Sequence, residues 1–428
     1  MQIEELYKIF IQHPSVQTDT RKLQNGDLYF ALKGENFNGN TFAKSALDNG
    51  AAYSIVDEDI EGSDTDERII KTNDVLATLQ ALAKYHRQQF TFPFIAITGS
   101  NGKTTSKELV HEVLSTTYKT YTTKGNLNNH IGIPLTILSV KKDAEIAVIE
   151  MGANHQKEIE SYCTYTLPTH GIITNCGKAH LEGFGGIEGV KKAKGELFDY
   201  LRSNNGTAFI MNDYDYLNEM SKGITFVKTY GTKDAEIVGN VNHTSQFLEV
   251  NISKGSSIKT IATNLVGEYN LPNILLAVAV GKYFNVADEK IKAALENYVP
   301  SNSRSQLIEK DSNKIILDTY NANPTSMKAA IENFAKMNVA DKIMILGAMM
   351  ELGDESNAEH AAIIKLIDTF KWQKVVLVGN DFNNIPNDHI NFPTADEAKE
   401  WFKQQSFTNS GILIKGSRSM KMEKVLEA

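Results

Sequence analysis

Residues 98–105 read Thr-Gly-Ser-Asn-Gly-Lys-Thr-Thr and follow directly on the apolar run Phe94–Ile97. A buried strand that leads through a glycine-rich turn into a helix points backbone N–H groups at phosphate oxygens, and the helix N-terminus adds partial positive charge. In such a loop Lys103 reaches the β- and γ-phosphates and the Thr104 hydroxyl ligates Mg²⁺. The common P-loop has one more glycine, where this chain has Ile97, and a chance glycine-rich turn is the alternative reading. We predict an ATP site, whose expected contacts are Gly99, Ser100, Asn101, Gly102, Lys103, Thr104 and Thr105.

Length and composition describe a multidomain globular protein. The 428 residues exceed one ordinary domain, and 41% hydrophobic with 22% charged residues are typical of a soluble protein with ample core. A net charge of −8, from 44 basic and 52 acidic residues, gives no electrostatic footprint for nucleic acid. The chain has two cysteines, Cys163 and Cys176, without metal-ligand spacing, which favours a reducing compartment.

The sequence shows no signal for export or membrane insertion. The amino-terminal residues Met-Gln-Ile-Glu-Glu lack a basic region followed by an apolar stretch. The longest clean apolar run, Ile274–Val280, is far too short to span a bilayer. We therefore expect a cytoplasmic protein with neither a membrane nor a nucleic acid as partner.

Residues 1–90 form the first of three predicted domains. Short strand candidates lie at 28–32 and 52–56, and a helical segment covers 75–89. This pattern predicts a small α/β domain.

Residues 91–300 form the second predicted domain. Its strands at 95–98, 145–151 and 171–175 alternate with helices at 105–118, 156–165 and 187–201. That alternation predicts a parallel sheet with helices on both faces. Short β-branched runs at 225–263 interrupt it and predict an antiparallel addition, and a helix at 271–284 closes the domain.

Residues 301–428 restart the alternation. Strands are predicted at 314–317, 342–346, 374–378 and 411–414, with helices at 326–337, 358–370 and 396–405. This predicts a second, smaller doubly wound unit, Rossmann-like in architecture. The expected fold is α/β with three domains: a small α/β N-terminal domain, a central P-loop parallel-sheet domain and a Rossmann-like C-terminal domain.

Two side chains are candidate metal ligands. Glu150 ends the apolar strand Ile146–Ile149, so we expect it at the carboxyl edge of the sheet, where ligands collect. His180 follows the strand at 171–175 in a glycine-rich stretch at the same edge, and imidazole can complete a second metal site. The alternatives are an ordinary strand-end carboxylate and a surface histidine.

Three lysines, Lys191, Lys192 and Lys194, lie close together on the next predicted helix. We expect two of these three lysine side chains to lie on the solvent-exposed face of the helix. A lysine buried beside Mg²⁺ is disfavoured as a cation and tends to be neutral. A neutral amine can add CO₂ and become an anionic carbamate, which binds metal.

Polar loops follow several strands. Two of them, 123–130 and 152–155, are rich in Asn and His, which suggests convergent hydrogen bonding to a substrate. Two more, 318–324 and 415–418, follow strands of the third domain and therefore lie on one edge of its sheet, facing a cleft. A series of turns is the alternative, because Asn and Gly also favour turns.

The motifs together resemble those of the Mur ligase family over essentially the whole chain. These motifs lie at residues 98–105, 125–134, 150–155, 179–185, 193–198, 320–327, 351–353 and 415–419. The stretch from Asp19-Thr20-Arg21 through Gly34 is similar to the family's uridine-binding domain. The motifs Asn-Leu-Asn-Asn-His, Ala-Asn-His, Tyr-Asn-Ala-Asn-Pro and Lys-Gly-Ser-Arg are selective for members that add D-alanyl-D-alanine.

The resemblance implies an ATP-dependent amide ligase that uses two Mg²⁺ ions. We expect the protein to be a monomer. Its substrates are UDP-N-acetylmuramoyl-tripeptide, held by residues 1–90, and D-alanyl-D-alanine, bound by residues 301–428, which close over ATP bound to 91–300. An acyl phosphate of the tripeptide is the implied intermediate.

The resemblance also implies individual roles. Lys103, His180 and Lys194 are the implied catalytic residues, with Thr104, Glu150, His180 and a carbamylated Lys194 as metal ligands. Further implied ATP contacts are Asn270, Asn273, Arg304 and Asp318. Implied substrate contacts are Asp19, Arg21, Lys33, Asn126, Asn128, Asn129, Asn154, His155, Tyr320, Asn321, Asn323, Lys415, Ser417 and Arg418.

Two other classes of function remain open. The first is a ligase of the same architecture that adds the third muropeptide residue or extends folate with glutamate, although the Asp-Asn-Pro-Arg stretch of diaminopimelate-adding relatives is not found. The second is a P-loop NTPase that acts as a switch, which would need no third domain with its own polar loops.

Overall fold

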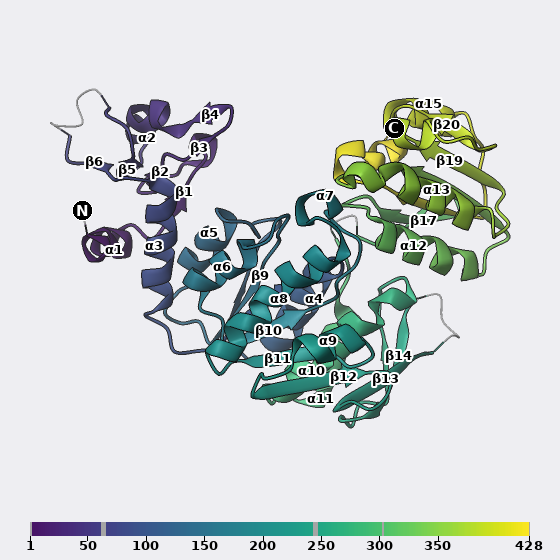
Figure 1. The fold of residues 1–428 in the computed structure, drawn as a ribbon, viewed down its shortest axis with the longest axis horizontal. Helices are drawn as coiled ribbons and strands as arrows, with labels where there is room; N and C mark the ends of the chain where they lie inside the picture. Colours follow the sequence, from purple (N-terminus) through teal and green to yellow (C-terminus); the bar gives the residue numbers. More distant parts are fainter. Residues whose placement is uncertain (1, 61–65, 243–246, 302–303, 428) are drawn as a thin grey trace.

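A computed structural model describes residues 2–60, 66–242, 247–301 and 304–427. Three main sheets form its framework (Figure 1). The N-terminal and C-terminal units lie at opposite ends of the molecule, and the central unit joins them. The three-domain α/β fold expected from the sequence is confirmed.

The N-terminal unit is built on a four-stranded parallel sheet in the order β1-β2-β5-β6. Its strands are β1 (Val16–Gln17), β2 (Leu28–Phe30), β5 (Tyr53–Val56) and β6 (Ile69–Lys71), and its helices are α1 (Ile3–Gln12), α2 (Ala43–Asp48) and α3 (Val75–Arg87). A two-stranded hairpin, β3 (Lys33–Gly34) and β4 (Phe37–Asn38), projects from it. Helix α3 packs on helices α5 and α6 of the central unit and so joins the two.

The central unit is a nine-stranded sheet in the order β15-β14-β13-β12-β11-β10-β7-β9-β8. Its strands are β7 (Phe94–Thr98), β8 (Thr120–Thr122), β9 (Ile146–Glu150), β10 (His170–Ile173), β11 (Thr207–Met211), β12 (Phe226–Gly231), β13 (Ile237–Asn242), β14 (Glu249–Lys254) and β15 (Thr260–Ala262). Its helices are α4 (Lys103–Ser115), α5 (Gly132–Leu138), α6 (Glu158–Thr166), α7 (Leu181–Phe184), α8 (Ile187–Ser203), α9 (Asp215–Met220), α10 (Leu271–Tyr283) and α11 (Asp288–Asn297).

The predicted antiparallel addition at 225–263 is only partly right. Strand β12 pairs parallel with β11, and β13 pairs parallel with β12. The antiparallel pairs are β13 with β14 and β14 with β15. β-Branched residues favour strands of either direction, so the pattern predicted strands but not how they pair.

Helix α10 explains the apolar run Ile274–Val280. All seven of these residues are buried, and α10 packs between α4 and strands β12 and β13. A helix that is apolar on all sides belongs in a protein core. Within the parts of the chain that the structure describes, no helix combines the length and apolar composition needed to cross a membrane.

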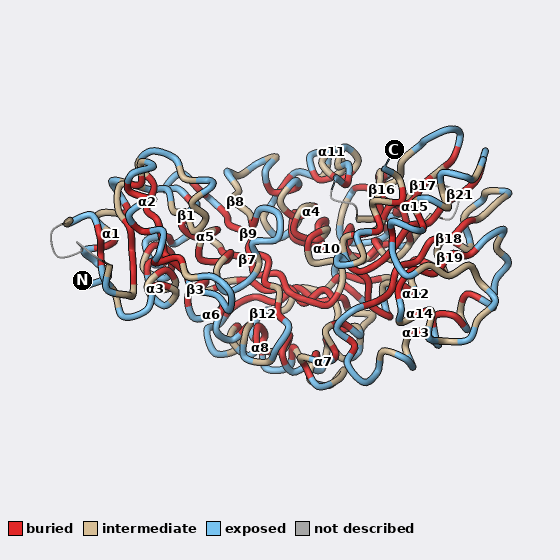
Figure 2. Tube along the Cα trace, turned by 90° about the horizontal axis from the view of Figure 1, so that it is seen from above, coloured by how far each residue is buried: buried red, intermediate tan, exposed pale blue. Residues whose placement is uncertain are grey.

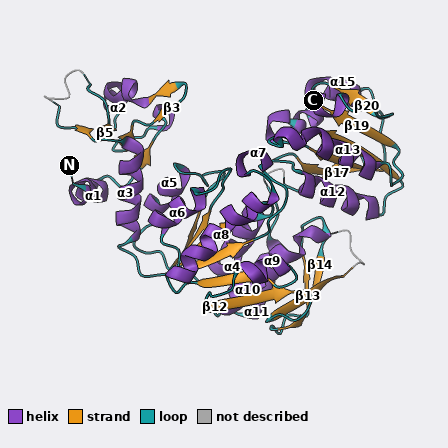
Figure 3. Ribbon diagram, viewed as in Figure 1, coloured by secondary structure: helices purple, strands orange, loops and turns teal. Residues whose placement is uncertain are grey.

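The C-terminal unit is a six-stranded sheet in the order β16-β17-β21-β18-β19-β20, parallel except for the edge strand β16. Its strands are β16 (Gln306–Lys310), β17 (Asn313–Asp318), β18 (Asp341–Gly347), β19 (Lys374–Val378), β20 (Ile390–Phe392) and β21 (Ser410–Lys415), and its helices are α12 (Pro324–Lys336), α13 (Ser356–Ile367), α14 (Asn380–Asn383) and α15 (Ala395–Lys403). In this unit the buried residues lie mainly along β17, β18, β19 and β21 (Figure 2), and helices pack against the sheet (Figure 3). The predicted boundaries at 90/91 and 300/301 fall between elements and stay predictions.

Candidate active site

Two glycines shape the turn between β7 and α4. Gly99 has a φ of +142° and Gly102 a φ of +79°. A Cβ atom on Gly99 would lie 2.0 Å from Thr174 Oγ1, and one on Gly102 would lie 2.8 Å from Asn273 Oδ1. Any side chain here would therefore be strained and would collide with its neighbours, so the loop requires glycine at both positions.

Lys103 begins helix α4 and folds back over the loop. Its Nζ atom donates to the carbonyl oxygens of Gly99, at 2.6 Å, and Ser100, at 3.3 Å. Burial lowers the pKa of Lys103 to about 8, an effect that nearby Glu150 opposes and Arg304 reinforces. The ammonium must exchange these carbonyl contacts for phosphate oxygens if a nucleotide binds.

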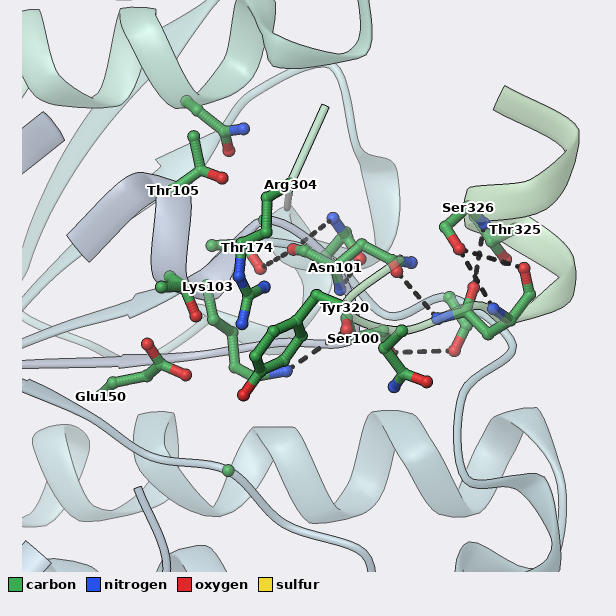
Figure 4. Close-up of a pocket in the computed structure, with 18 of the residues that line it drawn as sticks. Ser100, Asn101, Lys103, Thr105, Glu150, Thr174, Arg304, Tyr320, Thr325 and Ser326 are labelled. Atoms are coloured by element: carbon green, nitrogen blue, oxygen red, sulfur yellow. Dashed lines mark hydrogen bonds between the residues drawn. The ribbon is translucent and has the colours of Figure 1, made fainter. Parts of the chain in front are cut away.

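A cavity of about 1040 Å³ opens at the carboxyl ends of β7, β9 and β10, between the central and C-terminal units. Figure 4 shows Lys103, Glu150 and Arg304 beside this space. The sequence-predicted residues that line it are Ser100, Asn101, Gly102, Lys103, Thr104, Thr105, Asn126, Asn128, Asn129, Glu150, Asn154, His180, Asn270, Asn273, Arg304, Asp318, Tyr320, Asn321, Asn323 and Lys415. Tertiary structure thus brings together side chains from two domains.

Glu150 has the environment of a cation ligand. The residue is 1% exposed, and its Oε1 atom accepts a hydrogen bond of 2.7 Å from Asn128 Nδ2. Its Oε2 atom is buried without a hydrogen-bond partner among the described residues. Thr104, also buried, presents a hydroxyl to the same cavity. A buried carboxylate oxygen needs a partner, and Mg²⁺ bound by carboxylate, hydroxyl and phosphate oxygens fits this donor set.

The described residues contain no cluster of three or more His, Cys, Asp or Glu side chains that could hold a metal. A Mg²⁺ site here would therefore rely on one or two protein oxygens together with substrate phosphates, which is how this ion commonly binds.

Lys194 is buried and the other two lysines of helix α8 are not. Lys192 is exposed, and Lys191 is partly exposed and pairs with Glu188 at 2.6 Å. Lys194 is 1% exposed; its Nζ atom donates to Ala153 O at 3.3 Å and lies 4.9 Å from the ring centre of Phe184. Burial, reinforced by the charge of Lys103, lowers the pKa of Lys194 to about 7. Lys194 thus has an accessible neutral form, as the carbamate hypothesis requires.

Three charged residues of the C-terminal unit are held close to the cavity. The guanidinium of Arg304 lies 3.5 Å from the ring centre of Tyr320, a cation–π contact visible in Figure 4. Lys415, which is 1% exposed, donates to Asp318 Oδ2 at 2.7 Å and to Asn321 O at 3.1 Å. These contacts order the strand-end loops of β17 and β21 on one edge of the sheet.

Sequence reasoning missed many of the lining residues, among them Glu351, Tyr214 and Tyr216. Glu351 contacts His180, with 2.5 Å between Oε2 and Nδ1, and this hydrogen bond lowers the pKa of Glu351. Tyr214 and Tyr216 stack with ring centres 5.6 Å apart, and both line the cavity. Their position directly after strand β11 was the available signal, since that strand ends at the same sheet edge.

Several predicted residues lie outside the lining. Asp19 and Arg21 pair with each other at 2.8 Å in the N-terminal unit, where Lys33 pairs with Asp57 at 3.0 Å. Gly99 and Lys194 are buried and do not line the cavity. The remaining three are His155, which lies 3.8 Å from Glu158, Arg418, which pairs with Glu423 at 3.3 Å, and Ser417, which accepts a hydrogen bond from Met350 N at 3.0 Å.

Family models match most of the chain. The model described as "Mur ligase family, catalytic domain" matches residues 14–87, "Mur ligase middle domain" matches 97–281, and "Mur ligase, glutamate ligase domain" matches 303–418.

Full-length relatives share one name. The UDP-N-acetylmuramoyl-tripeptide–D-alanyl-D-alanine ligase of Escherichia coli is 35% identical over 99% of this chain and 95% of its own length. The enzyme of the same name from Bacillus subtilis is 34% identical over 96% of this chain and 92% of its own.

Solved structures of proteins named MurF are similar to this chain over most of its length. MurF from Acinetobacter baumannii superposes with a TM-score of 0.87 at 31% identity, covering 96% of this chain and 92% of its own. MurF ligase from Thermotoga maritima in complex with ADP superposes with a TM-score of 0.86 at 26% identity, covering 96% of each chain.

Proposed function

This chain belongs to the Mur ligase family, and from that premise we propose that it is an ATP-dependent ligase that joins D-alanyl-D-alanine to UDP-N-acetylmuramoyl-tripeptide. The observation that carries the proposal is the cavity itself. A phosphate loop, the buried carboxylate of Glu150, whose Oε2 atom has no hydrogen-bond partner among the described residues, and polar loops of a second domain all face this one space. The full-length relatives that bear this enzyme name support the choice of substrates.

The reaction proceeds in two steps. The terminal carboxylate of the tripeptide attacks the γ-phosphorus of ATP, forming an acyl phosphate and releasing ADP. The amine of D-alanyl-D-alanine then attacks the acyl carbon, and the tetrahedral intermediate loses a proton and expels phosphate to leave the amide. Both reactants of the first step are anions, so their approach requires positive charge. Lys103 and Arg304 supply it from opposite domains.

We assign Mg²⁺ to the same site. Thr104 and Glu150 would hold the first ion, and His180 with a carbamylated Lys194 would hold the second. Bound Mg²⁺ supplies electrostatic neutralisation of the phosphate and carboxylate oxygens. Buried Glu150 Oε2 is the observation that supports the first ion, and the lowered pKa of Lys194 supports the second.

We assign the three domains separate tasks. Residues 1–90 bind the UDP end of the tripeptide substrate, 91–300 bind ATP, and 301–428 bind the dipeptide. Closure of the C-terminal domain over this cavity would exclude water, which protects an acyl phosphate from hydrolysis. We also propose that the enzyme is a cytoplasmic monomer; both cysteines are free and buried, which fits a reducing compartment.

The test is phosphate release from ATP with Mg²⁺, UDP-N-acetylmuramoyl-tripeptide and D-alanyl-D-alanine, each omitted in turn. We expect release only with the complete mixture, together with a product heavier than the tripeptide substrate by one condensed dipeptide. Release that needs glutamate or another amine instead would place the chain in another branch of ligases. Release that ignores every acceptor would overturn the ligase assignment in favour of a nucleotide switch.

A further inference from the structure

One side chain of the C-terminal unit contacts the phosphate loop. Asn323 Nδ2 donates to Asn101 Oδ1 at 2.8 Å, and Asn323 is 6% exposed. Its other amide atom, Oδ1, accepts from Ser326 N at 2.9 Å and thereby caps helix α12. Because the helix uses the oxygen, the NH₂ group must face Asn101.

Side chains of the central unit form hydrogen bonds with the backbone of Asn101. Its backbone N–H donates to Asn175 Oδ1 at 3.1 Å. Its carbonyl oxygen accepts from Thr174 Oγ1 at 2.6 Å and from Asn175 Nδ2 at 3.1 Å. The backbone of Asn101 is thus fixed within its own domain, whereas Asn323 binds its side chain from the other domain.

The packing around this contact is tight. A Cβ atom on Gly177 would lie 3.0 Å from Thr325 Oγ1 and 3.1 Å from Asn101 Nδ2. The carbonyl oxygen of Gly177 accepts from Ser100 Oγ at 2.9 Å, and the next residue, Lys178, donates its N–H to Thr325 Oγ1 at 3.0 Å. The loop after β10 is therefore packed between the phosphate loop and the start of α12.

We propose that Asn323 is a positioning residue of the nucleotide site, and that its bond to Asn101 makes nucleoside-phosphate affinity depend on docking of the C-terminal domain. The proposal rests on the proposed function only in taking an adenine nucleotide as the ligand. It gives Asn323 a role toward the phosphate loop in place of the dipeptide contact that family resemblance implies. Docking and phosphate binding should stabilise each other, because docking orders the side chain of Asn101, which belongs to the phosphate loop.

A double-mutant cycle on the full chain tests this coupling, with ADP affinity measured by isothermal titration in Mg²⁺ without either peptide substrate. Asn323→Ser keeps a good helix cap but is too short to reach Asn101. Asn323→Ser and Asn101→Ala should each weaken ADP binding by about 3- to 10-fold, as expected for one lost hydrogen bond. The double variant should bind ADP within about 2-fold of the weaker single variant, since both changes remove the same interaction.

Lys328→Ala is the matched control, because Lys328 lies on the same helix with its side chain 63% exposed. We expect it to bind ADP as the unaltered chain does. Melting temperatures of all variants show whether the effect is on binding or on folding, and a purely structural role for Asn323 would lower the melting temperature without coupling to Asn101.

Three results would overturn the proposal: unchanged ADP affinity in Asn323→Ser, losses that multiply in the double variant, or an unaltered chain that binds no ADP. A coupled cycle in a chain that fails to ligate D-alanyl-D-alanine would remove the proposed function and leave the role of Asn323 intact.

Discussion

The Nδ1 atom of His180 lies 2.5 Å from the Oε2 atom of Glu351, so the central and C-terminal domains meet in a histidine–carboxylate contact at the cavity lining. Both residues have left-handed backbones, with φ values of 53° and 62°. Such conformations cost energy in residues other than glycine and are frequent where function requires a particular side-chain direction. With Nδ1 engaged by the carboxylate, Nε2 is the nitrogen left for a ligand.

Glu351→Ala should lower kcat/KM by about 10- to 100-fold, the usual cost of removing a carboxylate that orients a metal-binding histidine. The loss should diminish as the Mg²⁺ concentration is raised, and steady-state rates across a Mg²⁺ series measure it. Asp354→Asn is the control, since Asp354 is exposed three positions away. Activity of Glu351→Ala equal to that of the control would contradict a role for the pair.

Lys103→Ala should lower turnover by at least about 100-fold, because a preorganised positive charge toward the transferring phosphate is lost. Folding should be preserved, since Lys103 bonds only to carbonyls of its own loop among the contacts described. Phosphate release and the circular dichroism melting curve check the two parts. A normally folded, fully active variant would refute the phosphate-loop assignment.

Lys194→Ala should abolish ligation, and a small carboxylate such as acetate or formate should restore part of it. The neutral amine of Lys194, which is populated above its pKa of about 7, adds to CO₂ and releases a proton to form a carbamate. An added carboxylate can replace that anion in the space left by the alanine variant. Lys192→Ala, on the exposed side of α8, should remain fully active. Carboxylate rescue is measured by phosphate release, and its complete absence would argue against carbamylation.

His170 should make the central domain sensitive to acid. Burial lowers its pKa from 6.5 to about 4, and its ring packs against Phe209, Tyr283 and Phe284. The unfolded state therefore takes up the proton first as pH falls, and stability is lost from about pH 6.5 down to about pH 4. Between pH 7.5 and pH 5 this loss amounts to about 2 kcal/mol.

The His170→Gln variant should lack this part of the acid sensitivity, while His130→Gln, at an exposed histidine, should keep it. Urea unfolding at the two pH values gives the comparison. If the free energy of unfolding fell by the same amount between the two pH values in His170→Gln and in the unaltered chain, His170 would not be the group that takes up a proton on unfolding.

The sequence predicted best what depends on neighbouring residues. Apolar runs followed by glycine placed strand β7, the phosphate loop and helix α4 correctly, because backbone geometry and burial there are set within a few residues. The lysines of α8 show the limit of this reasoning. The sequence led us to expect two solvated lysines, and the family resemblance pointed to Lys194 as the third. Its burial, beside Ala153 and Phe184, is seen only in the tertiary structure.

The direction of strand pairing and the contacts between domains could not be predicted from the sequence either, because both depend on residues far apart in the chain. The β-branched runs at 225–263 predicted strands, yet parallel pairing of β12 with β11 depends on how the intervening helix α9 crosses the sheet. Glu351 belongs to a family motif, but its role depends on His180, which lies in another domain.

By itself the sequence determined the phosphate loop, the alternation of strands and helices, and the family. Each of these depends on glycines, apolar runs or polar motifs that lie within a few residues of one another. Only the tertiary structure decided which distant side chains reach the phosphate loop. It brings Asn323 to Asn101 and Glu351 to His180, and it leaves Asp19 outside the cavity. Docking of whole domains sets these contacts, since it depends on the fit of surfaces assembled from residues far apart in the chain.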